Sequence, residues 1–548
     1  MSSDAKIELL PRHLTLSVPR GAPLQDFLFA QGVEFPCGGR GRCKGCRIKV
    51  LAGSLPITEE DRQRLAPDDL AQGWRLACRA HAEGDLKIDL AQWEAAILTD
   101  DSAFAFTPRT GLGVAIDLGT TTLVAQLLDL STGAVLAVRT ALNAQAKHGA
   151  DVMSRVEFAV AGENSQQERL PRFEPMNRGG TGGLAPSPPP EERAGERRLF
   201  PAEVHGNGQR QLQAIIHDQL RVLIEELLAE APPTTGADLK SIVIVGNTVM
   251  HHLFCGIDLE PLSHYPFEPV APGLQLFSAG QLGWPLPGDT VVHFLPCLGG
   301  FVGSDILAGI LACKLHQRDS LAALVDLGTN GEIVVGNRER LLCASTAAGP
   351  AFEGARISMG MRAASGAISE VHQENGKMHC HVLGNAPPRG ICGSGLVDAA
   401  ASGLDLGWLR PNGRFSKGDS MPLCGPVFLN QWDIRELQLA KGAIAAGIRL
   451  LLSQWGAALG DVKEVFLAGA FGNYINYASA RRIGLLEFAP DSVRPAGNTA
   501  LLGAKMALFE LETHRGAYPD ILARTTHVSL NEDPTFHEIF VEQMQFPG

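Results

Sequence analysis

The sequence has no long apolar run and no cleavable leader pattern. None of its apolar stretches reaches the roughly 18 residues that a membrane-spanning helix needs. The N-terminal stretch MSSDAKIELLPRH lacks an apolar segment followed by a small-residue cleavage site, so a secretory signal peptide is not expected. These absences argue against a membrane-spanning or secreted protein and favour a cytoplasmic one.

The sequence also has relatively few basic residues and no basic block. Its 47 Lys and Arg stand against 59 Asp and Glu, which gives a formal net charge of −12. A nucleic-acid partner is therefore not expected, because such proteins gather Lys and Arg on one face. Hydrophobic residues make up 45% of the 548, which is enough to build several cores.

The 11 cysteines are not expected to form disulfides in a cytoplasmic protein. Four of them cluster, with five, two and 31 residues between them: Cys37, Cys43, Cys46 and Cys78. Three thiolates on one Gly-rich loop, CGGRGRCKGC, with a fourth from a later segment, predict a [2Fe–2S] cluster. A structural zinc site is the alternative, but zinc is usually held by two pairs of closely spaced ligands. Most of the other seven cysteines are interpreted as small buried side chains.

The cysteine cluster lies in a small, mostly β segment that resembles ferredoxins of the adrenodoxin-like spacing. Strand character is present at residues 5–17, 46–51 and 85–90, with a short helical stretch around 23–31. We therefore expect an α+β ferredoxin-like β-grasp domain over residues 1–95.

Two similar strand–turn–strand segments predict a phosphate-binding site. Asp117 ends an apolar strand and opens the turn DLGTTT, and Asp326 opens the turn DLGTNGE in the same context. A tight glycine turn directs backbone N–H groups and Thr hydroxyls toward phosphate oxygens, and the Asp lies where Mg²⁺ or its water shell is held. One such turn is a weak signal, but two copies predict two related lobes that face each other across a cleft.

Two Gly-rich segments follow nearer the C-terminus. At 466–473 an apolar strand runs into the turn FLAGAFGN, where a nucleotide base and ribose can lie against the backbone. A plain strand–helix turn is the alternative for this segment. At 497–504 the small residues of GNTALLGA suit a close-packed helix crossing.

The remaining segments set the domain boundaries. Residues 96–112 are polar, contain Pro and Gly, and are interpreted as a linker. The first lobe is expected over 113–320 and the second over 321–548. Residues 163–208 are rich in Pro, Gly, Arg and Glu and predict a disordered insertion, followed by an amphipathic helix at 209–230.

The order of two phosphate turns and an adenosine turn resembles the actin/Hsp70/sugar-kinase superfamily. The whole chain resembles the ATP-dependent reductive activators of corrinoid proteins. The matching stretches cover nearly all of it apart from the insertion: CGGRGRCKGC, GWRLAC, DLGTTT, VGNTVMHHL, FVGSDILAGIL, DLGTNGE, STAAGPAFEGARISMGMRAASGAI, GICGSGLVDA and FLAGAFGN.

This resemblance implies a two-lobed α/β ATPase behind the ferredoxin domain, with a [2Fe–2S] cluster, ATP and Mg²⁺ as cofactors. It implies that an electron reduces the Co(II) of a corrinoid protein to Co(I) and so rescues a corrinoid-dependent methyltransferase system. The implied partners are that corrinoid protein and an upstream low-potential electron donor. Their identities and the oligomeric state, for which a homodimer is one option, stay open.

The candidate site residues come from these motifs. Catalysis and Mg²⁺ handling are expected from three carboxylates: Asp117, Asp326 and Glu332. Nucleotide binding is expected from the turns and from the stretch at 345–368: Gly119, Thr120, Thr121, Thr122, Gly328, Thr329, Asn330, Gly349, Glu353, Gly469, Gly472 and Asn473. The role of Ser345 stays open. Cys392 is interpreted as a small residue among glycines, and His251–His252 as a pair on a helix surface.

Three rival functions are considered. An ATP-dependent electron activator of another low-potential metalloenzyme would resemble this ATPase, but such activators use a [4Fe–4S] cluster shared between subunits. A small-molecule kinase would have no evident use for a fused ferredoxin. A chaperone of the Hsp70 kind would be expected to carry a β-rich peptide-binding domain after the ATPase.

Overall fold

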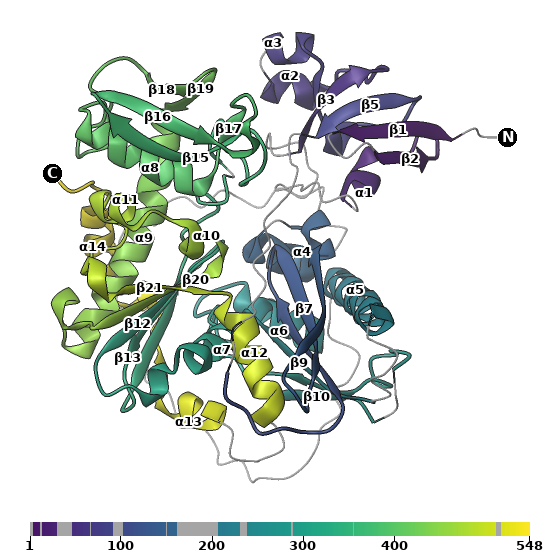
Figure 1. Cartoon of the computed structure of the whole chain (residues 1–548), viewed down its shortest axis with the longest axis vertical. Coiled ribbons are helices and arrows are strands. Elements are labelled where there is room, and N and C mark those ends of the chain that lie inside the picture. The colour runs from purple at the N-terminus through teal and green to yellow at the C-terminus, as the bar shows by residue number, and fades with distance from the viewer. Residues whose placement is uncertain are drawn as a thin grey trace, which may run out of the picture.

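The structure is a computed structural model in which an N-terminal β-rich unit stands beside two larger α/β units (Figure 1). No helix among the residues it describes is both long and apolar enough to cross a bilayer. The described residues are 4–10, 14–29, 46–65, 67–90, 102, 104–149, 151–161, 207–230, 238–286, 289–354, 356–510 and 517–548.

The N-terminal unit is a five-stranded sheet with three short helices. Its strand order is β2-β1-β5-β3-β4, with β1 and β5 parallel and the other pairs antiparallel. Every second residue of β1 and β5 is buried, because one face of the sheet covers the core. This is the β-grasp arrangement expected for the segment. Its elements are β1 (Ala5–Leu10), β2 (Leu14–Val18), α1 (Leu24–Phe29), β3 (Arg47–Ala52), α2 (Glu59–Arg64), α3 (Pro67–Ala71), β4 (Trp74–Leu76) and β5 (Leu86–Leu90).

The first lobe is built on a six-stranded sheet with the order β10-β11-β9-β6-β7-β8. An antiparallel meander, β6-β7-β8, is extended by β9 and β11 in parallel. Alternate residues of β6 enter different cores, with Val114 and Ile116 on one face and Ala115 on the other. The elements are β6 (Leu112–Leu118), β7 (Thr122–Asp129), β8 (Val135–Leu142), α4 (Val152–Ala161), α5 (Asn207–Glu230), β9 (Leu239–Gly246), α6 (Thr248–Cys255), β10 (Gln275–Ser278), β11 (Val291–Phe294) and α7 (Ser304–Cys313).

The second lobe repeats five strands of this topology, with the order β21-β20-β12-β13-β14-β22, and its sixth strand, β22, pairs with the opposite edge. Its meander is β12-β13-β14, and β20 and β21 extend it in parallel. The duplication predicted from the two turns is therefore present in the fold. The main elements are β12 (Ala322–Leu327), β13 (Gly331–Gly336), β14 (Leu341–Thr346), α8 (Gly393–Asp405), α9 (Gln431–Trp455), β20 (Glu464–Ala468), α10 (Gly469–Tyr474), α11 (Tyr477–Arg482), β21 (Val493–Gly497), α12 (Thr499–Glu510), α13 (Ala517–Arg524), β22 (Thr525–His527) and α14 (Phe536–Gln543).

Two small sheets are inserted in the second lobe, and they lie beside α8 in the green part of Figure 1. One has the order β16-β15-β17 and the other is a single hairpin. Their strands are β15 (Ala367–Glu374), β16 (Lys377–Val382), β17 (Gly390–Ile391), β18 (Ser420–Cys424) and β19 (Val427–Asn430).

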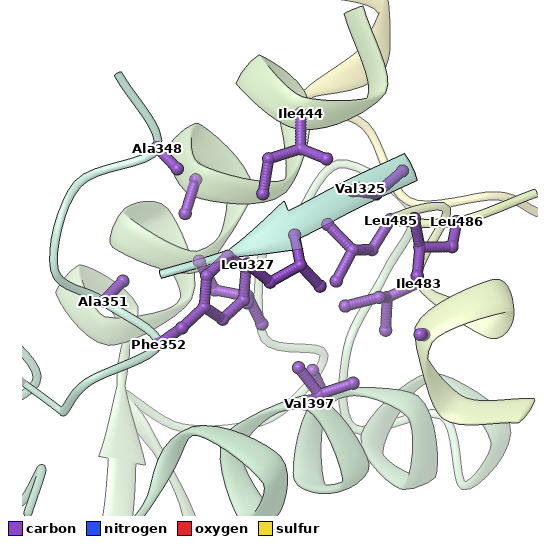
Figure 2. Close-up of a cluster of buried hydrophobic side chains, with 14 of the residues drawn as sticks. Val325, Leu327, Ala348, Ala351, Phe352, Val397, Ile444, Ile483, Leu485 and Leu486 are labelled. Carbon is purple, nitrogen blue, oxygen red and sulfur yellow. The ribbon is translucent and has the colours of Figure 1, made fainter. Parts of the chain in front are cut away.

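The core of the second lobe packs around β12. Val325 and Leu327 point from this strand into a cluster that also receives Ile444 of α9 and Val397 of α8 (Figure 2). All four side chains are essentially excluded from water. Burying each contributes about 1.5–3 kcal/mol relative to exposure, so this cluster fixes the strand that carries Asp326.

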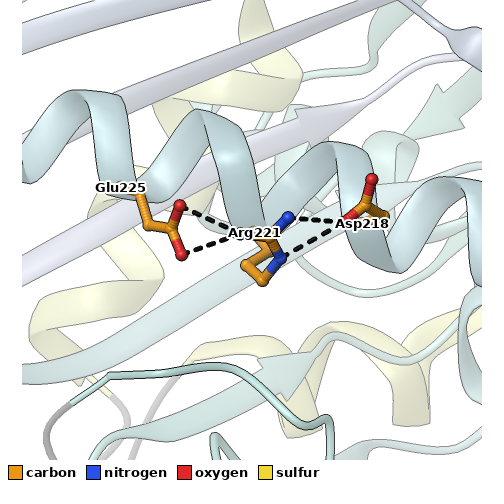
Figure 3. A network of polar contacts seen from close by, with 3 residues as sticks. All are labelled: Asp218, Arg221 and Glu225. Atoms are coloured by element: carbon orange, nitrogen blue, oxygen red, sulfur yellow. Dashed lines mark hydrogen bonds and ion pairs between the residues drawn. The ribbon is translucent and has the colours of Figure 1, made fainter.

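Helix α5 has one apolar face and one charged side. Its buried leucines and isoleucines recur at helical spacing: Leu212, Ile216, Leu220, Leu223, Ile224 and Leu227. On the solvent side Arg221 donates to Asp218 at 2.6 Å and to Glu225 at 2.9 Å (Figure 3). Such exposed pairs contribute little because water screens their charges, so the apolar face holds the helix on the sheet.

Helix α12 crosses α7 between the two large sheets (Figure 1). A Cβ atom on Gly503 would lie 2.1 Å from the carbonyl oxygen of Ala308, and one on Gly309 would lie 3.1 Å from Oγ1 of Thr499. The close crossing predicted from GNTALLGA is confirmed. The helix also packs on β6 and β9, so residues 499–510 complete the core of the first lobe although they follow the second lobe's strands.

Three expectations differ from the structure. The predicted insertion at 163–208 lies outside the described residues up to 206, but α5 begins at Asn207, so its last two residues are helical. The second half of the predicted linker packs on α12, where Phe106 and Phe509 lie 4.5 Å apart. The helix-surface interpretation of His251–His252 is wrong, because both rings are fully buried.

Candidate functional site

The two predicted phosphate turns face one cavity of about 310 Å³ between the lobes. The first turn spans 119–122, between the paired residues Leu118 and Leu123, and the second spans 328–330, between Leu327 and Gly331. The cavity is lined by Asp117, Gly119, Thr120, Thr121, Thr122, Val124, Asn247, Asp305, Asp326, Gly328, Thr329, Asn330, Glu332, Phe352, Glu353, Met361, Arg362, Ala363, Cys392, Gly393, Ser394, Gly469, Phe471, Tyr474, Asn498 and Ala500.

Three aspartates converge in the cavity. Asp117 ends β6, Asp326 lies on β12, and Asp305 lies in the first turn of α7. Desolvation raises the pKa of Asp117 to about 6, and a hydrogen bond from Asn498 at 2.9 Å partly offsets this. Desolvation also raises the pKa of Asp326 to about 7 and that of Asp305 to about 8, and repulsion from the neighbouring aspartates adds to both. The site thus concentrates negative charge that a cation would neutralise.

Two glutamates border the second turn. Glu332 pairs with Asp326 across the β12–β13 hairpin, and its carboxylate accepts from Ser345 Oγ at 3.3 Å. Burial is the main reason that the pKa of Glu332 is raised well above its ordinary value. Glu353 accepts from Thr329 Oγ1 at 2.6 Å, and burial likewise raises its pKa. Ser345, whose role the sequence left open, and Glu353, which was expected to bind nucleotide, therefore both hydrogen-bond to residues of the second hairpin.

The third predicted element meets the cavity through Gly469. This residue has a φ of +81° and opens α10 directly after β20. A Cβ on Gly472 would contact the backbone of Leu467 at 3.5 Å, so this glycine lies against its own strand, and neither it nor Gly349 lines the cavity. Asn473 is on α10, but its side chain lies outside the described part of the structure.

The polar cavity residues that the sequence analysis did not single out include Asn247, Asp305, Arg362 and Asn498. Asn247 caps α6 and donates to Thr120 Oγ1 at 2.8 Å. Asp305 carries the only charge of an otherwise apolar helix, SDILAGILAC, which was a usable signal. Arg362 gave no such signal, because it lies in a long irregular stretch, and desolvation lowers its pKa to about 10.

Part of the cavity lining is aromatic. Phe352 and Phe471 stack with ring centroids 4.5 Å apart and an interplanar angle of 16°, and Tyr474 stands beside them with 56% of its surface exposed. Cys392 lies nearby, and its thiol is 3.3 Å from Ser394 Oγ. The cavity lining therefore combines carboxylates with apolar rings, as a site for a nucleoside triphosphate and a cation requires.

The carboxylates fit Mg²⁺ bound mainly through other ligands. No group of three or more His, Cys, Asp or Glu side chains within the described ranges is placed to ligate one metal ion. Mg²⁺ usually retains several waters and takes one or two carboxylates together with phosphate oxygens. One or two of the carboxylates of Asp117, Asp305 and Asp326 would hold the ion directly and the others would bind its waters, with the nucleotide supplying the remaining ligands.

Two of the four predicted iron ligands lie side by side. Cys46 directly precedes β3, Cys78 follows β4, and the two strands pair with Arg47 opposite Leu76. Ala77 N–H donates to the carbonyl of Cys46 at 3.0 Å, which extends this pairing up to the cysteines. Both are buried, as cluster ligands shielded from water would be. Cys37 and Cys43 lie outside the described residues.

Comparison with known proteins covers the chain from end to end. Three family descriptions match: "2Fe-2S iron-sulfur cluster binding domain" at residues 7–83, "RACo middle region" at 112–172 and 197–318, and "C-terminal domain of RACo the ASKHA domain" at 320–548. These matches and the topology confirm the predicted fold class, a ferredoxin domain followed by an ATPase of the actin/Hsp70/sugar-kinase type.

Individual relatives show the same pattern. The chain is 33% identical over 465 residues to the corrinoid activation enzyme RamQ of Eubacterium limosum, covering 79% of this chain and 70% of that protein. It is 24% identical over 349 residues to a Methanosarcina barkeri [Co(II) methylated amine-specific corrinoid protein] reductase, covering 56% and 63%. A solved structure of a reductive activator for a corrinoid, iron–sulfur protein superposes with a TM-score of 0.62 and 25% identity, over 99% of this chain and 98% of that one.

Proposed function

The chain belongs to the RACo family of reductive activators, and on this premise we propose that it uses ATP to reduce the cobalt of a corrinoid protein from Co(II) to Co(I). One observation carries the proposal. A ferredoxin domain with two buried, adjacent cysteines packs directly on an ATPase whose cleft is built from two phosphate turns. Neither a simple kinase nor a simple electron carrier needs both parts in contact.

The energetic reason for using ATP is the low potential of the Co(II)/Co(I) couple. A plant-type [2Fe–2S] ferredoxin has a potential of about −400 mV. For each ~59 mV by which the potential of the cobalt couple lies below that of the cluster, the equilibrium constant for one-electron reduction falls about tenfold. Nucleotide binding and hydrolysis can offset the shortfall if the corrinoid protein binds one conformation of the two lobes more tightly than the other.

We assign the cavity residues by position. Asp117, Asp305 and Asp326 hold Mg²⁺ and its waters, and the hydroxyls and amides of the two turns bind the phosphates. Glu332, next to Asp326, is placed to orient the attacking water. Arg362 is the cation of the cavity lining and neutralises phosphate charge. The Phe352–Phe471 pair gives the adenine base an apolar surface.

The ferredoxin domain supplies the electron. Cys37, Cys43, Cys46 and Cys78 hold the [2Fe–2S] cluster, whose chemistry is the transfer of single electrons. When bound, the cluster would supply single electrons from an upstream low-potential donor to the cobalt of the partner, and ATP and water would give ADP and phosphate. Rescue of a methyltransferase system follows if the partner is a methyl carrier whose Co(I) has been lost to oxidation.

The test is anaerobic. The purified chain, loaded with iron and sulfide, is mixed with a Co(II) corrinoid protein and a chemical reductant, and the absorbance of Co(I) is followed with and without MgATP. We expect Co(I) only when ATP is present, and none with Asp326→Asn. Equal reduction without ATP, or ATP-dependent phosphorylation of a sugar or acetate with no protein partner present, would contradict the proposal.

A further inference from the structure

Residues 142–147 lie between the ferredoxin domain and the first phosphate turn. Leu142, Ala144 and Ala146 pack against the core of the ferredoxin domain. The residues between them, Asn143 and Gln145, are fully buried in the first lobe. One short segment thus presents an apolar side to one domain and a polar side to the other.

The polar side of this segment holds the phosphate turn by its backbone. The N–H of Asn143 donates to the carbonyl of Thr121 at 2.9 Å, and its Nδ2 donates to the carbonyl of Gly119 at 2.9 Å. The carbonyl between these two, that of Thr120, accepts from the guanidinium of Arg155. Hydrogen bonds from Asn143 and Arg155 therefore fix three consecutive carbonyls of the turn.

Arg155 links the phosphate turn to residues 145 and 149 through hydrogen bonds. It is fully buried on α4, and it also donates to Gln145 Oε1 at 3.1 Å and to the carbonyl of Gly149 at 2.9 Å. These acceptors are neutral, so its position depends on hydrogen-bond geometry, and a buried donor that loses its acceptor costs about 1–3 kcal/mol. A shift of residues 142–147 therefore has to move Arg155 and the turn together.

We propose that Asn143 and Arg155 are positioning residues through which docking of the ferredoxin domain orders the first phosphate turn. Docking and nucleotide binding then favour each other, since a coupling free energy acts equally in both directions. The proposal rests on the proposed function only in taking this turn as a site for nucleotide phosphate. It explains how an electron-carrying domain outside the cleft can respond to the nucleotide inside it.

A second contact between the ferredoxin domain and the ATPase supplies a matched control. Arg389, just before β17 in the second lobe, donates to Asp89 at 3.5 Å, and its guanidinium lies 6.0 Å from the ring of Trp74. This contact has no hydrogen bond to the first turn. Removing it takes away one polar contact but leaves the packing of residues 142–147 on the ferredoxin domain and the support of the turn intact.

The experiment compares Ala146→Arg with Arg389→Met in the full chain. Titration calorimetry with Mg²⁺ and a non-hydrolysable ATP analogue gives the affinities, and hydrogen–deuterium exchange of residues 119–122 and 142–147 reports the turn. We expect Ala146→Arg to weaken analogue binding about 5-fold or more and to speed exchange in both segments. Arg389→Met and the conservative Ala146→Ser should match the unmodified chain.

Each outcome has a defined meaning. Equal affinity for Ala146→Arg and the unmodified chain would overturn the coupling while leaving the proposed function intact. If the unmodified chain does not bind the analogue, both fail. Should Ala146→Arg not fold, exchange in the unmodified chain decides: the analogue should slow exchange in 142–147 as well as in 119–122, and protection of the turn alone would overturn the inference.

Discussion

Asp326 and Gly469 are in contact across two parallel strands, and a Cβ atom on Gly469 would stand 2.4 Å from Oδ1 of Asp326. The strands pair with Asp326 beside Ala468, so the turn after β20 necessarily passes the carboxylate. The third Gly-rich motif therefore reaches the carboxylates of the cavity through Gly469 and its aromatic lining through Phe471.

We predict that Gly469→Ala abolishes ATP hydrolysis. The new methyl group would displace Asp326, and the φ of +81° adds strain of roughly 1–2 kcal/mol for a residue with a Cβ. Steady-state ATPase assays should show kcat reduced at least ~100-fold. The control is Gly456→Ala, which has a φ of +84° but no atom within 4 Å of the added Cβ. It should lose a little stability and keep full activity.

We predict that the metal-free protein loses stability as the pH rises from about 4 to about 8. Asp117, Asp326 and Asp305 have raised pKa values of about 6, 7 and 8 against an ordinary 3.8. The folded state therefore keeps protons that the unfolded state releases, and the free energy of unfolding falls as each carboxyl ionises. Thermal melts in chelator should show a falling Tm, and Mg²⁺ with an ATP analogue should restore it.

Asp305→Asn should flatten the same pH profile and reduce kcat about 100-fold or more, because one ionisable group and one Mg²⁺ anchor are lost together. Melts of this variant between pH 5 and 8 and ATPase assays at pH 7.5 test the two effects separately. An unchanged slope would mean that Asp305 is ionised throughout this range.

We predict that Phe471→Ala raises the KM for ATP about 10-fold with little change in kcat, consistent with the ~1–3 kcal/mol of a base–aromatic stack. The control is Phe536→Ala, which breaks another stacked pair, with Phe540, at 6.3 Å and 17° on α14. Both variants lose a ring, but only the first ring lines the cavity. Equal KM values for the two variants would show that Phe471 does not contribute to nucleotide binding.

We predict that Cys46→Ser removes the visible absorbance and most of the iron of the reconstituted protein while leaving its ATPase activity in place. Cys46 is buried beside Cys78 in the ferredoxin domain, away from the cavity. Cys380→Ser, on the half-buried strand β16, is the control and should bind iron normally. Retention of a full [2Fe–2S] spectrum in Cys46→Ser would refute its assignment as a ligand.

The sequence predicted those parts of the site that depend on local backbone. The two Asp-Leu-Gly-Thr turns follow from short motifs whose geometry is set within a few residues. Asn247 and Asn498 could not be placed in this way. Each stands at a strand-to-helix junction far along the chain, and only the pairing of β6 with β9 and the packing of α12 bring them to Thr120 and Asp117.

The burial of His251–His252 shows a second limit. Two adjacent polar residues on a short helix suggest a surface, but α6 is enclosed by α5 and the sheet, and the rings hydrogen-bond to backbone carbonyls of Gly273 and Thr248. Desolvation lowers the pKa of His251 to about 3 and that of His252 to about 4, so both stay neutral. Tertiary packing buries both histidines, and the residue pattern of an eight-residue helix does not reveal such packing.

The crossing of α12 over β6 and β9 also governs how the protein can be made. The first lobe leaves the ribosome early, but the part of its sheet that α12 covers stays exposed until residues 499–510 have been translated. At ordinary rates of elongation the stretch from β11 to residue 510 takes roughly 10 to 45 s. During that time an apolar sheet surface is exposed to other nascent chains, so we expect the yield of folded protein to depend on chaperones and on slow translation far more than that of the ferredoxin domain does.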